Sequence, residues 1–437
     1  MTSLNDTSMD FNGRIKVNFD GGNLTNDAGL LLYKEFAEKV GLSQLIQSTV
    51  ILNDPVNHDV HTNDSVIMQK IYQHIAGYNA DDHADSLRYD PALTTILEKD
   101  WLASQPTMSR VNQLFDTEAI KQLQHVNDTL IERYHELSSP EDIILDLDST
   151  NAATYGNQHG SAYNTHYGEN GYHPMLMFDG LTGDCLKAEL RAGSVYTSRQ
   201  VVRFVGPTLK RYKTLYPWIS PVIRGDSGFA IPELFELAET KEALYVIRLK
   251  ANKRLYTKAE ELLAQIPDDV IEATSVFYRE FSYQAKSWTQ PRRVVVKIER
   301  PTDELLFQFT FIVTNMNLSP KNITKLYFNR GTMENYIKEG KLGFAFGKMT
   351  STEFERNACK LQIAIIAYNL HNGFKRLCFP ESMNTNLINT VRLQLIKIAG
   401  KITRSSRYLT FKLSSHCLYK KEFMETLSRV QMLPRFG

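Results

Sequence analysis

The fold is decided by the segment Leu145-Asp146-Leu147-Asp148-Ser149-Thr150, in which apolar and polar side chains alternate. A period of two predicts a β-strand with Asp146, Asp148 and Thr150 on one face and the two leucines on the other. Two carboxylates on one sheet face repel each other unless a cation lies between them, and Mg²⁺ and Mn²⁺ prefer carboxylate oxygen. The segment therefore predicts a strand with a candidate divalent-metal site. The alternative is a strand end whose acids face water.

Strands and helices alternate after this first strand. Further β-type patterns are followed by helical ones in the order 173–178 (β), 185–190 (β), 198–212 (α), 221–224 (β), 231–239 (α) and 244–249 (β). The order β-β-β-α-β-α-β predicts an α/β sheet with helical crossovers. Strand-like segments at 293–298 and 305–314 predict a β-rich insertion over 251–315, and helices resume near Ile323 and run through Leu377.

The chain before this sheet is predicted to be mostly helical. Alternation at Ile15 to Phe19 predicts one short strand, after which apolar residues recur at helical spacing, with Asp27 as the expected cap of the first helix. The expected domains are an α-rich N-terminal domain, the first part of the core, the insertion, a helical completion of the core and a basic tail. Their residues are 1–138, 139–250, 251–315, 316–378 and 379–437, respectively.

Composition is typical of globular proteins. The chain has 437 residues, of which 42% are hydrophobic and 23% charged, so the disordered, collagen-like and coiled-coil classes are excluded. No apolar stretch reaches the roughly 20 residues of a membrane-spanning helix, and Asp6 and Asp10 argue against a signal peptide. The four cysteines include no Cys-x-x-Cys pair. We expect a soluble, intracellular protein.

Charge is distributed unevenly along the chain. Residues 375–437 contain 12 Lys and Arg against three Glu, a net charge of +9, while the rest of the chain carries −8. Lysines and arginines can replace the counterions of nucleic acid, so the tail predicts a polyanionic partner. The alternative is a solvated helical face.

A second candidate acid follows the strand at 221–224. Asp226 lies where this β-branched strand runs into the glycine turn of Gly225. Open α/β sheets place functional side chains at such strand ends, so Asp226 is a candidate functional residue.

The third candidate segment runs from Tyr327 to Lys341. At 100° per residue of an α-helix, Tyr327, Arg330, Glu334 and Lys341 fall within a sector of about 60°. One helix face then presents an acid, two cations and a phenol, which suits a metal-binding carboxylate flanked by phosphate-binding groups. The alternative is an ordinary solvated face.

With these residues the chain resembles the DDE insertion-sequence transposases, which are related to retroviral integrases, in the branch marked by Tyr-(2)-Arg-(3)-Glu-(6)-Lys. The four residues of the third segment match this spacing, and the resemblance covers roughly 142–377. Many relatives have Trp where this chain has Gly331. The implied fold is α/β, with a ribonuclease-H-like core interrupted by a β-rich insertion and an α-rich N-terminal domain that binds DNA ends.

The resemblance implies an acid triad of Asp148, Asp226 and Glu334 that holds two Mg²⁺ or Mn²⁺ ions. Asp148 is favoured for the first acid because it is followed by Thr150, although Asp146 could share or take over this role. Such a metal pair would activate water for cleavage of transposon ends and then stabilise strand transfer by a DNA 3′-hydroxyl.

The partners that the resemblance implies are double-stranded DNA, namely terminal inverted repeats and target DNA, and a second copy of the chain in the DNA complex. The location that it implies is the cytoplasm of a bacterial-type cell, in association with the nucleoid. Tyr327, Arg330 and Lys341 are expected to contact DNA. Trp288, in the insertion, could stack on a flipped base, or it could be a core residue. A metal-dependent nuclease or resolvase on the same core and a domesticated DNA-binding protein without catalysis are the alternatives to a transposase.

Overall fold

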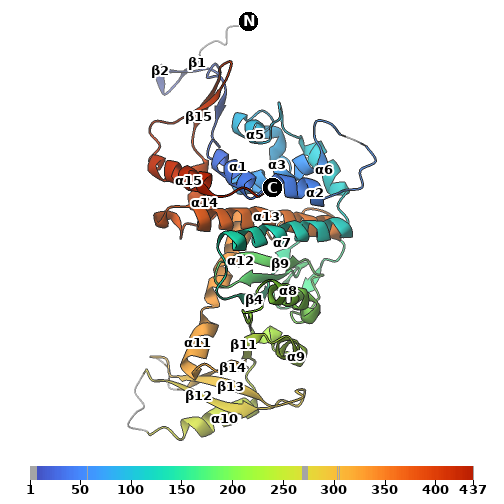
Figure 1. The fold of residues 1–437 in the computed structure, drawn as a ribbon, viewed down its shortest axis with the longest axis vertical. Coiled ribbons are helices and arrows are strands. Elements are labelled where there is room, and N and C mark those ends of the chain that lie inside the picture. Colours follow the sequence, from blue (N-terminus) through green and yellow to red (C-terminus); the bar gives the residue numbers. More distant parts are fainter. Residues whose placement is uncertain (1–6, 57, 268–273, 303, 305, 437) are drawn as a thin grey trace. The chain divides into compact units, whose positions relative to one another are not determined.

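The computed structural model describes residues 7–56, 58–267, 274–302, 304 and 306–436 (Figure 1). Parts of the predicted N-terminal domain, insertion and tail (residues 1–6, 57, 268–273, 303, 305 and 437) lie outside this range. The chain forms two compact units. Unit 1 comprises 1–126, 342–345 and 362–437, and unit 2 comprises 127–341 and 346–361. No helix of the described part has the length and apolar character needed to cross a membrane.

Unit 2 is built on one eight-stranded mixed sheet, which confirms the predicted α/β class (Figure 1). The spatial order of its strands is β12-β13-β14-β11-β10-β4-β8-β9. Their bounds are β4 (Ile144–Ser149), β8 (Met175–Asp179), β9 (Cys185–Glu189), β10 (Val222–Gly225), β11 (Leu244–Leu249), β12 (Val276–Tyr283), β13 (Arg292–Glu299) and β14 (Gln308–Thr314). The strands β4, β10 and β11 are parallel, and all other neighbours are antiparallel.

The two faces of this sheet pack against different helices. Leu145, Leu147 and Ile223 face a large core that includes residues of α8 (Val201–Leu215) and α9 (Pro232–Thr240). Ile144 and Val222 face a smaller cluster with residues of α11 (Pro320–Phe328). Because successive side chains of a strand point to opposite faces, Asp146 and Asp148 lie on the α11 side.

The predicted insertion is continuous with the core sheet. Its strands β12, β13 and β14 extend the sheet beyond β11, to which β14 pairs in antiparallel register, and helix α10 (Lys253–Leu263) precedes them. The predicted strands at 293–298 and 305–314 correspond to β13 and β14, whereas β12 and α10 were not predicted. The sequence showed the type of element but contained no signal for the edge to which these strands would pair.

A small sheet of three strands was not predicted. It contains β5 (Ala152–Ala153), β6 (Ala162–Asn164) and β7 (Glu169–Tyr172) in the order β5-β7-β6. These strands are only two to four residues long, so they are too short to display a hydrophobic period.

The predicted helix from Tyr327 to Lys341 is interrupted. Helix α11 ends at Phe328 and helix α12 (Gly331–Phe344) begins after a turn at Asn329 and Arg330. The helical-wheel argument therefore holds only for the residues within α12, and Tyr327 and Arg330 are placed by the end of α11 and by the turn. The following helix is α13 (Phe354–Cys378).

Unit 1 is mainly helical. Its elements from the first part of the chain are β1 (Thr7–Met9), β2 (Asn12–Val17), β3 (Leu24–Thr25), α1 (Leu30–Lys39), α2 (Leu42–Thr49), α3 (Asn63–Ala76), α4 (His83–Ser86), α5 (Pro91–Ile96) and α6 (Gln105–Gln113). Helix α7 (Thr117–Leu137) contributes residues to both units.

The predicted cap of the first helix was wrong, since Gly29 is the N-cap. Asp27 is buried instead, and its carboxylate accepts hydrogen bonds from Lys397 (2.6 Å) and Tyr78 (2.8 Å).

The C-terminal segment folds into unit 1. It forms α14 (Ile388–Val391), β15 (Gly400–Arg404), β16 (Leu409–Leu413) and α15 (Lys420–Met432). Strand β15 pairs with β3, and Lys39 of α1 donates hydrogen bonds to the carbonyls of Gln431 and Leu433. The segment predicted as a basic tail is thus held to the beginning of the chain by backbone pairing.

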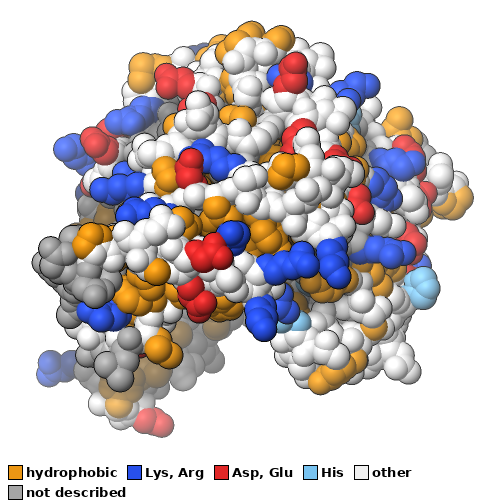
Figure 2. All heavy atoms as spheres, turned by 90° about the horizontal axis from the view of Figure 1, so that it is seen from below, with side chains coloured by type: hydrophobic (Ala, Val, Ile, Leu, Met, Phe, Trp, Pro, Cys, Tyr) orange, Lys and Arg blue, Asp and Glu red, His pale blue; other side chains and the backbone are white. Residues whose placement is uncertain are grey.

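Figure 2 shows the face seen from below in the orientation of Figure 1. On this face a row of Lys and Arg side chains lies beside exposed hydrophobic side chains.

Candidate active site

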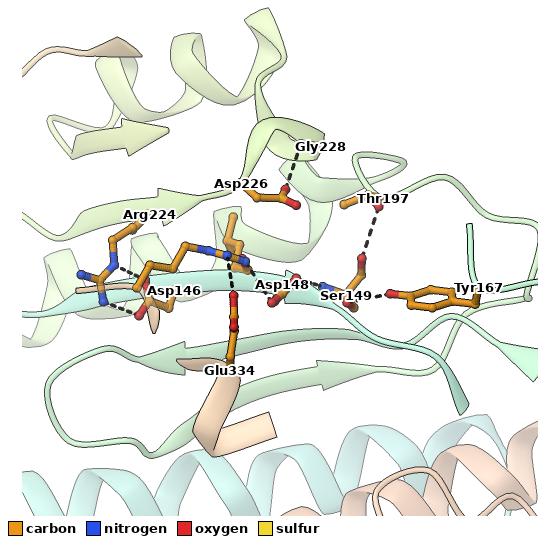
Figure 3. Close-up of polar contacts among 11 residues, drawn as sticks. Asp146, Asp148, Ser149, Tyr167, Thr197, Arg224, Asp226, Gly228 and Glu334 are labelled. Carbon is orange, nitrogen blue, oxygen red and sulfur yellow. Dashed lines mark hydrogen bonds and ion pairs between the residues drawn. The ribbon is translucent and has the colours of Figure 1, made fainter. Parts of the chain in front are cut away.

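Two of the three predicted acids lie at the ends of neighbouring parallel strands. In the pairing of β4 with β10, Asp146 is opposite Arg224 and Leu147 is opposite Gly225. The next positions along this register are Asp148 and Asp226, so the sheet itself brings these carboxylates to one edge (Figure 3). Asp226 also caps a short 3₁₀ turn (Ser227–Phe229) by accepting a hydrogen bond from the backbone N–H of Gly228 at 2.9 Å.

Asp146 is held by a buried arginine. Nε and Nη2 of Arg224 each donate to one of its two carboxylate oxygens at 2.5 Å, and the two side chains are 0% and 1% exposed. Burial raises the pKa of Asp146, and the arginine opposes this shift. A Cβ on Gly180 would lie 2.6 Å from Asp146 Oδ2, so only glycine fits beside the pair. Both carboxylate oxygens are therefore already engaged in the protein interior.

Asp148 is placed differently, at the edge of the same strand. One carboxylate oxygen accepts from the backbone N–H of Ser149 at 2.8 Å, and the other lies 2.9 Å from Nη2 of Arg330. The pKa of Asp148 is raised to about 6, mainly by burial and also by the nearby charges of Asp226 and Glu334, while Arg330 and the N–H of Ser149 oppose this shift. An acid that is desolvated beside two other acids is typical of a functional site.

Arg330 lies among the three acids. Its guanidinium contacts Asp148, lies 3.9 Å from Glu334 and donates to the carbonyl of Leu147 at 3.3 Å. Burial lowers the pKa of Arg330, but the charges of Asp148 and Asp226 outweigh this effect and raise it. Its Nε is buried without a hydrogen-bond partner among the described residues. The turn between α11 and α12 thus places a cation where three negative charges would otherwise repel one another.

Glu334 reaches the same arginine from the first turn of α12. Its side chain is 72% exposed, so it can move toward or away from the strand edge without a packing cost. Figure 3 shows Asp148, Asp226 and Glu334 coming from three different elements. The fold therefore brings the three predicted acids into one neighbourhood, with one of them free to rearrange.

The other predicted DNA-contacting residues of this segment have different surroundings. Lys341 donates to the hydroxyl of Thr150 at 3.1 Å, and burial lowers the pKa of Lys341. Tyr327 is only 6% exposed and packs in the cluster beneath α11. Lys341 therefore lies at the strand edge near the acids, whereas the ring of Tyr327 is a packing group.

Trp288 does not have the exposure that base stacking requires. It is 7% exposed, and its ring packs edge-on against Phe235 and Tyr283 at centroid distances of 5.5 Å, with Arg292 over its face. The prediction that Trp288 stacks on a base is corrected to the core alternative, because protein groups already cover its ring.

Sequence reasoning missed a second set of residues at the strand edge. Tyr167, from the turn between β6 and β7, donates to the carbonyl of Ser149 at 3.2 Å, and the Ser149 hydroxyl is 3.2 Å from that of Thr197 (Figure 3). Burial, followed by the charges of Asp148 and Asp226, raises the pKa of Tyr167 to about 12. No local pattern identifies this tyrosine, because only the unpredicted small sheet brings it to the acids.

The donor chemistry of the three acids fits hard divalent cations, since carboxylate oxygens are their preferred ligands. The described residues nevertheless contain no group of three His, Cys, Asp or Glu side chains arranged closely enough to hold a metal ion. Arg330 is paired with Asp148 and lies next to Glu334 in this arrangement. The three carboxylates therefore fit a divalent cation in the chemistry of their donor atoms.

Comparison with known proteins identifies a family and a similar solved structure. Residues 7–435 match the family described as Transposase DDE domain group 1. The chain is also similar to the piggyBac transposase in a cryo-EM structure of its synaptic complex with hairpin DNA, with 12% sequence identity and a TM-score of 0.48, over 94% of this chain and 86% of that one. There is no significant match among curated protein sequences.

Proposed function

The chain belongs to the DDE transposase family described as Transposase DDE domain group 1, and we propose that it cleaves transposon ends and joins them to target DNA in a metal-dependent reaction at Asp148, Asp226 and Glu334. The observation that carries this proposal is the strand register, which makes Asp148 and Asp226 neighbours at one sheet edge. We assign the chain to the Tyr-Arg-Glu-Lys branch on the spacing of Tyr327, Arg330, Glu334 and Lys341.

A ribonuclease-H-like core is part of the proposal. Five strands of the central sheet occur in chain order as β4, β8, β9, β10 and β11, and their spatial order is β9-β8-β4-β10-β11. The first strand is therefore in the middle, next to the fourth. Asp148 lies near the end of the first of these strands, and Asp226 directly follows the fourth. This order supports the core that the family resemblance implies.

Two Mg²⁺ or Mn²⁺ ions would be held by the carboxylates of Asp148, Asp226 and Glu334. When bound, such a pair supplies an activated nucleophile and charge stabilisation at the phosphorus. Asp146 is left out of this set, because both its oxygens already accept from Arg224. Glu334 is the acid that can adjust its position, since its side chain is largely in solvent.

The cations beside the acids would bind the phosphodiester. Arg330 has a planar donor fork that suits a phosphate, and Lys341 provides a second charge on the same side of the strand edge. A phosphate that takes the guanidinium of Arg330 would release Asp148 and Glu334 from it. Binding of DNA would thus free the carboxylates of Asp148 and Glu334 to bind metal ions. Assembly of the metal site would then depend on bound DNA.

The proposed substrate is double-stranded DNA with the terminal inverted repeats of the element, together with a target duplex. We further propose that a homodimer holds both ends, because joining two ends to one target requires an active site for each end.

The test is Glu334→Gln, assayed on duplex DNA that carries the inverted repeats flanking the gene. The variant keeps side-chain shape and hydrogen-bonding capacity but loses the charge that a metal requires. End binding should survive, and Mg²⁺-dependent cleavage should fall by about 10³-fold or more. Asp226→Asn should behave in the same way.

Glu233→Gln is the matched control, because Glu233 is an exposed acid in the first turn of another helix, α9. It should cleave at the wild-type rate. Wild-type cleavage by Glu334→Gln would refute the acid triad. A wild type that cuts without joining would point to a nuclease, and one that binds ends without cutting in Mg²⁺ or Mn²⁺ would point to a non-catalytic binder.

A further inference from the structure

Strands β15 and β16 form an exposed two-stranded ribbon in unit 1, far along the chain from the candidate active site. Gly400 is opposite Leu413 at its base and Arg404 is opposite Leu409 at its tip. The base is anchored by pairing of β15 with β3 and by hydrogen bonds from the N–H of Ile402 to the carbonyl of Asn23 and from Ser414 to Ala399. Both ribbon strands appear in red in Figure 1. The ribbon is therefore fixed at one end and open along its length.

Four cations of this ribbon are exposed, namely Lys401, Arg404, Arg407 and Lys412. None of them forms an ion pair with a carboxylate in the described part of the chain. Lys401 lies directly opposite Lys412 in the register. Like charges in facing positions of a β-pair are destabilising. The isolated ribbon thus carries a repulsion that an anionic partner would relieve.

The neighbouring cations show that this is a property of the ribbon and not of the whole basic segment. No acid occurs between Glu381 and Glu422. Lys397 nevertheless pairs with Asp27 at 2.6 Å. Arg392 is buried and donates to the carbonyls of His74, Ile75 and Gly343. The cations near the helices thus serve the fold, and those on the ribbon have no such role.

The tip of the ribbon is ordered by its own hydrogen bonds and presents an aromatic ring. The backbone N–H of Ser405 donates to the carbonyl of Tyr408 at 2.9 Å, and the N–H of Tyr408 donates to the Ser405 hydroxyl at 3.2 Å. Tyr408 is 72% exposed between Arg407 and Leu409. An exposed ring next to a cation suits a surface of sugars, phosphates and base edges.

We propose that the β15–β16 ribbon, residues 400–413, docks in a groove of duplex DNA as a binding element separate from the acids of unit 2. A two-stranded ribbon fits the roughly 12 Å width of the major groove of B-DNA. Its four free cations would displace condensed counterions from the phosphates. The inference rests on the proposed function in that duplex DNA is the substrate, but it concerns binding and needs no cleavage.

The experiment replaces Lys401, Arg404, Arg407 and Lys412 together by Gln in the full-length chain. Binding to a fluorescent 40-base-pair duplex is measured in EDTA over a range of salt concentrations. Each phosphate contact contributes about −0.9 to the slope of log K against log[salt], so the slope should lose about 3 to 4 units. Tyr408→Ala alone should weaken binding with little change in slope, because no charge is removed.

The matched control replaces four exposed cations of unit 2, Lys250, Lys253, Arg254 and Lys286, by Gln. It should keep the wild-type slope. An equal loss of slope in both variants would mean that only the net charge of the protein matters, and it would overturn the inference. An unchanged slope in the ribbon variant would also overturn it, and wild-type binding to vesicles with 30% phosphatidylserine that the ribbon variant lacks would then identify a membrane as the partner.

Folding of the ribbon variant is checked by its thermal midpoint, which should equal or exceed that of wild type because the Lys401 and Lys412 repulsion is gone. If the variant fails to fold, acetylation of wild-type Lys401 and Lys412 with and without the duplex provides the test. Protection by DNA supports the inference, and unchanged reactivity overturns it. Failure here leaves the effect of Glu334→Gln on cleavage untouched, so the two proposals fail separately.

Discussion

Strand β4 carries two aspartates that both pair with arginine, and the two pairs have opposite characters. Asp146 and Arg224 are sealed in the interior, whereas Asp148 and Arg330 remain partly open to solvent two residues further along. Arg224 belongs to the neighbouring strand β10, and the pairing of β10 with β4 holds it opposite Asp146. Arg330 comes from a turn between two helices, which can move without breaking the sheet. The same side-chain chemistry thus gives a structural pair and a displaceable one, depending on what carries the arginine.

The largest expected difference between Asp146 and Asp148 concerns activity. It is measured by neutralising each aspartate in turn and following cleavage of end DNA under single-turnover conditions. Asp148→Asn should lower the rate by about 10³-fold or more, because it removes a proposed metal ligand. Asp146→Asn should stay within about tenfold of wild type for each folded molecule, since its oxygens bind Arg224. If Asp146→Asn loses as much activity as Asp148→Asn, the first acid of the triad has been assigned wrongly.

The second prediction concerns stability, for which Asp146 should matter more than Asp148. Asp146→Asn should lower the free energy of unfolding by about 3–5 kcal/mol, because it leaves a buried guanidinium without its counter-charge. Urea unfolding gives this value. The double variant Asp146→Leu with Arg224→Met should recover much of the loss, since an apolar pair replaces the ion pair. A single variant as stable as wild type would mean that the interior pair contributes nothing to the fold.

The third and smallest effect is a pH dependence of the displaceable pair. Burial raises the pKa of Asp148 from its ordinary value of 3.8 to about 6, so the folded state binds the proton more tightly than the unfolded state does. The carboxyl therefore destabilises the fold as the pH rises from about 4 to 6, by at most about 3 kcal/mol. In EDTA, Asp148→Asn should match wild type at pH 4 and be more stable at pH 7.

Asp100→Asn serves as the control for this titration, because Asp100 is an exposed aspartate of unit 1. The stability difference between Asp100→Asn and wild type is measured at the same pH values for comparison. A flat profile for Asp148→Asn would show that Arg330 fully compensates the burial of the carboxylate.

The sequence predicted those parts of the fold that depend on local periodicity. Alternation located β4, and β-branched runs located β10 and β11, because a buried strand needs apolar side chains wherever it pairs. The helix patterns of α8 and α9 were equally clear. The three acids were proposed from the sequence because Asp148 and Asp226 lie near strand ends and Glu334 belongs to a spaced motif.

What the sequence did not reveal depends on contacts between distant residues. Arg224 was visible beside Asp226, but only the register shows that it neutralises Asp146. The turn at Asn329 and Arg330 contains neither proline nor glycine, since Gly331 already belongs to α12. The sequence pattern therefore predicted one continuous helix. Trp288 is buried by Phe235, which lies 53 positions earlier and on another element.

The continuity of the central sheet has a practical consequence for anyone who wishes to isolate the catalytic part. In the intact chain, β14 pairs with β11 over residues 246–249. A truncated core without residues 251–315 would leave the N–H and C=O groups on that side of β11 unpaired, although β10 would still cover the other side. Such an exposed edge strand, with the apolar sequence Leu244–Leu249, is a template for intermolecular pairing and aggregation. A soluble minimal fragment should therefore retain the three added strands, even if they take no part in the chemistry.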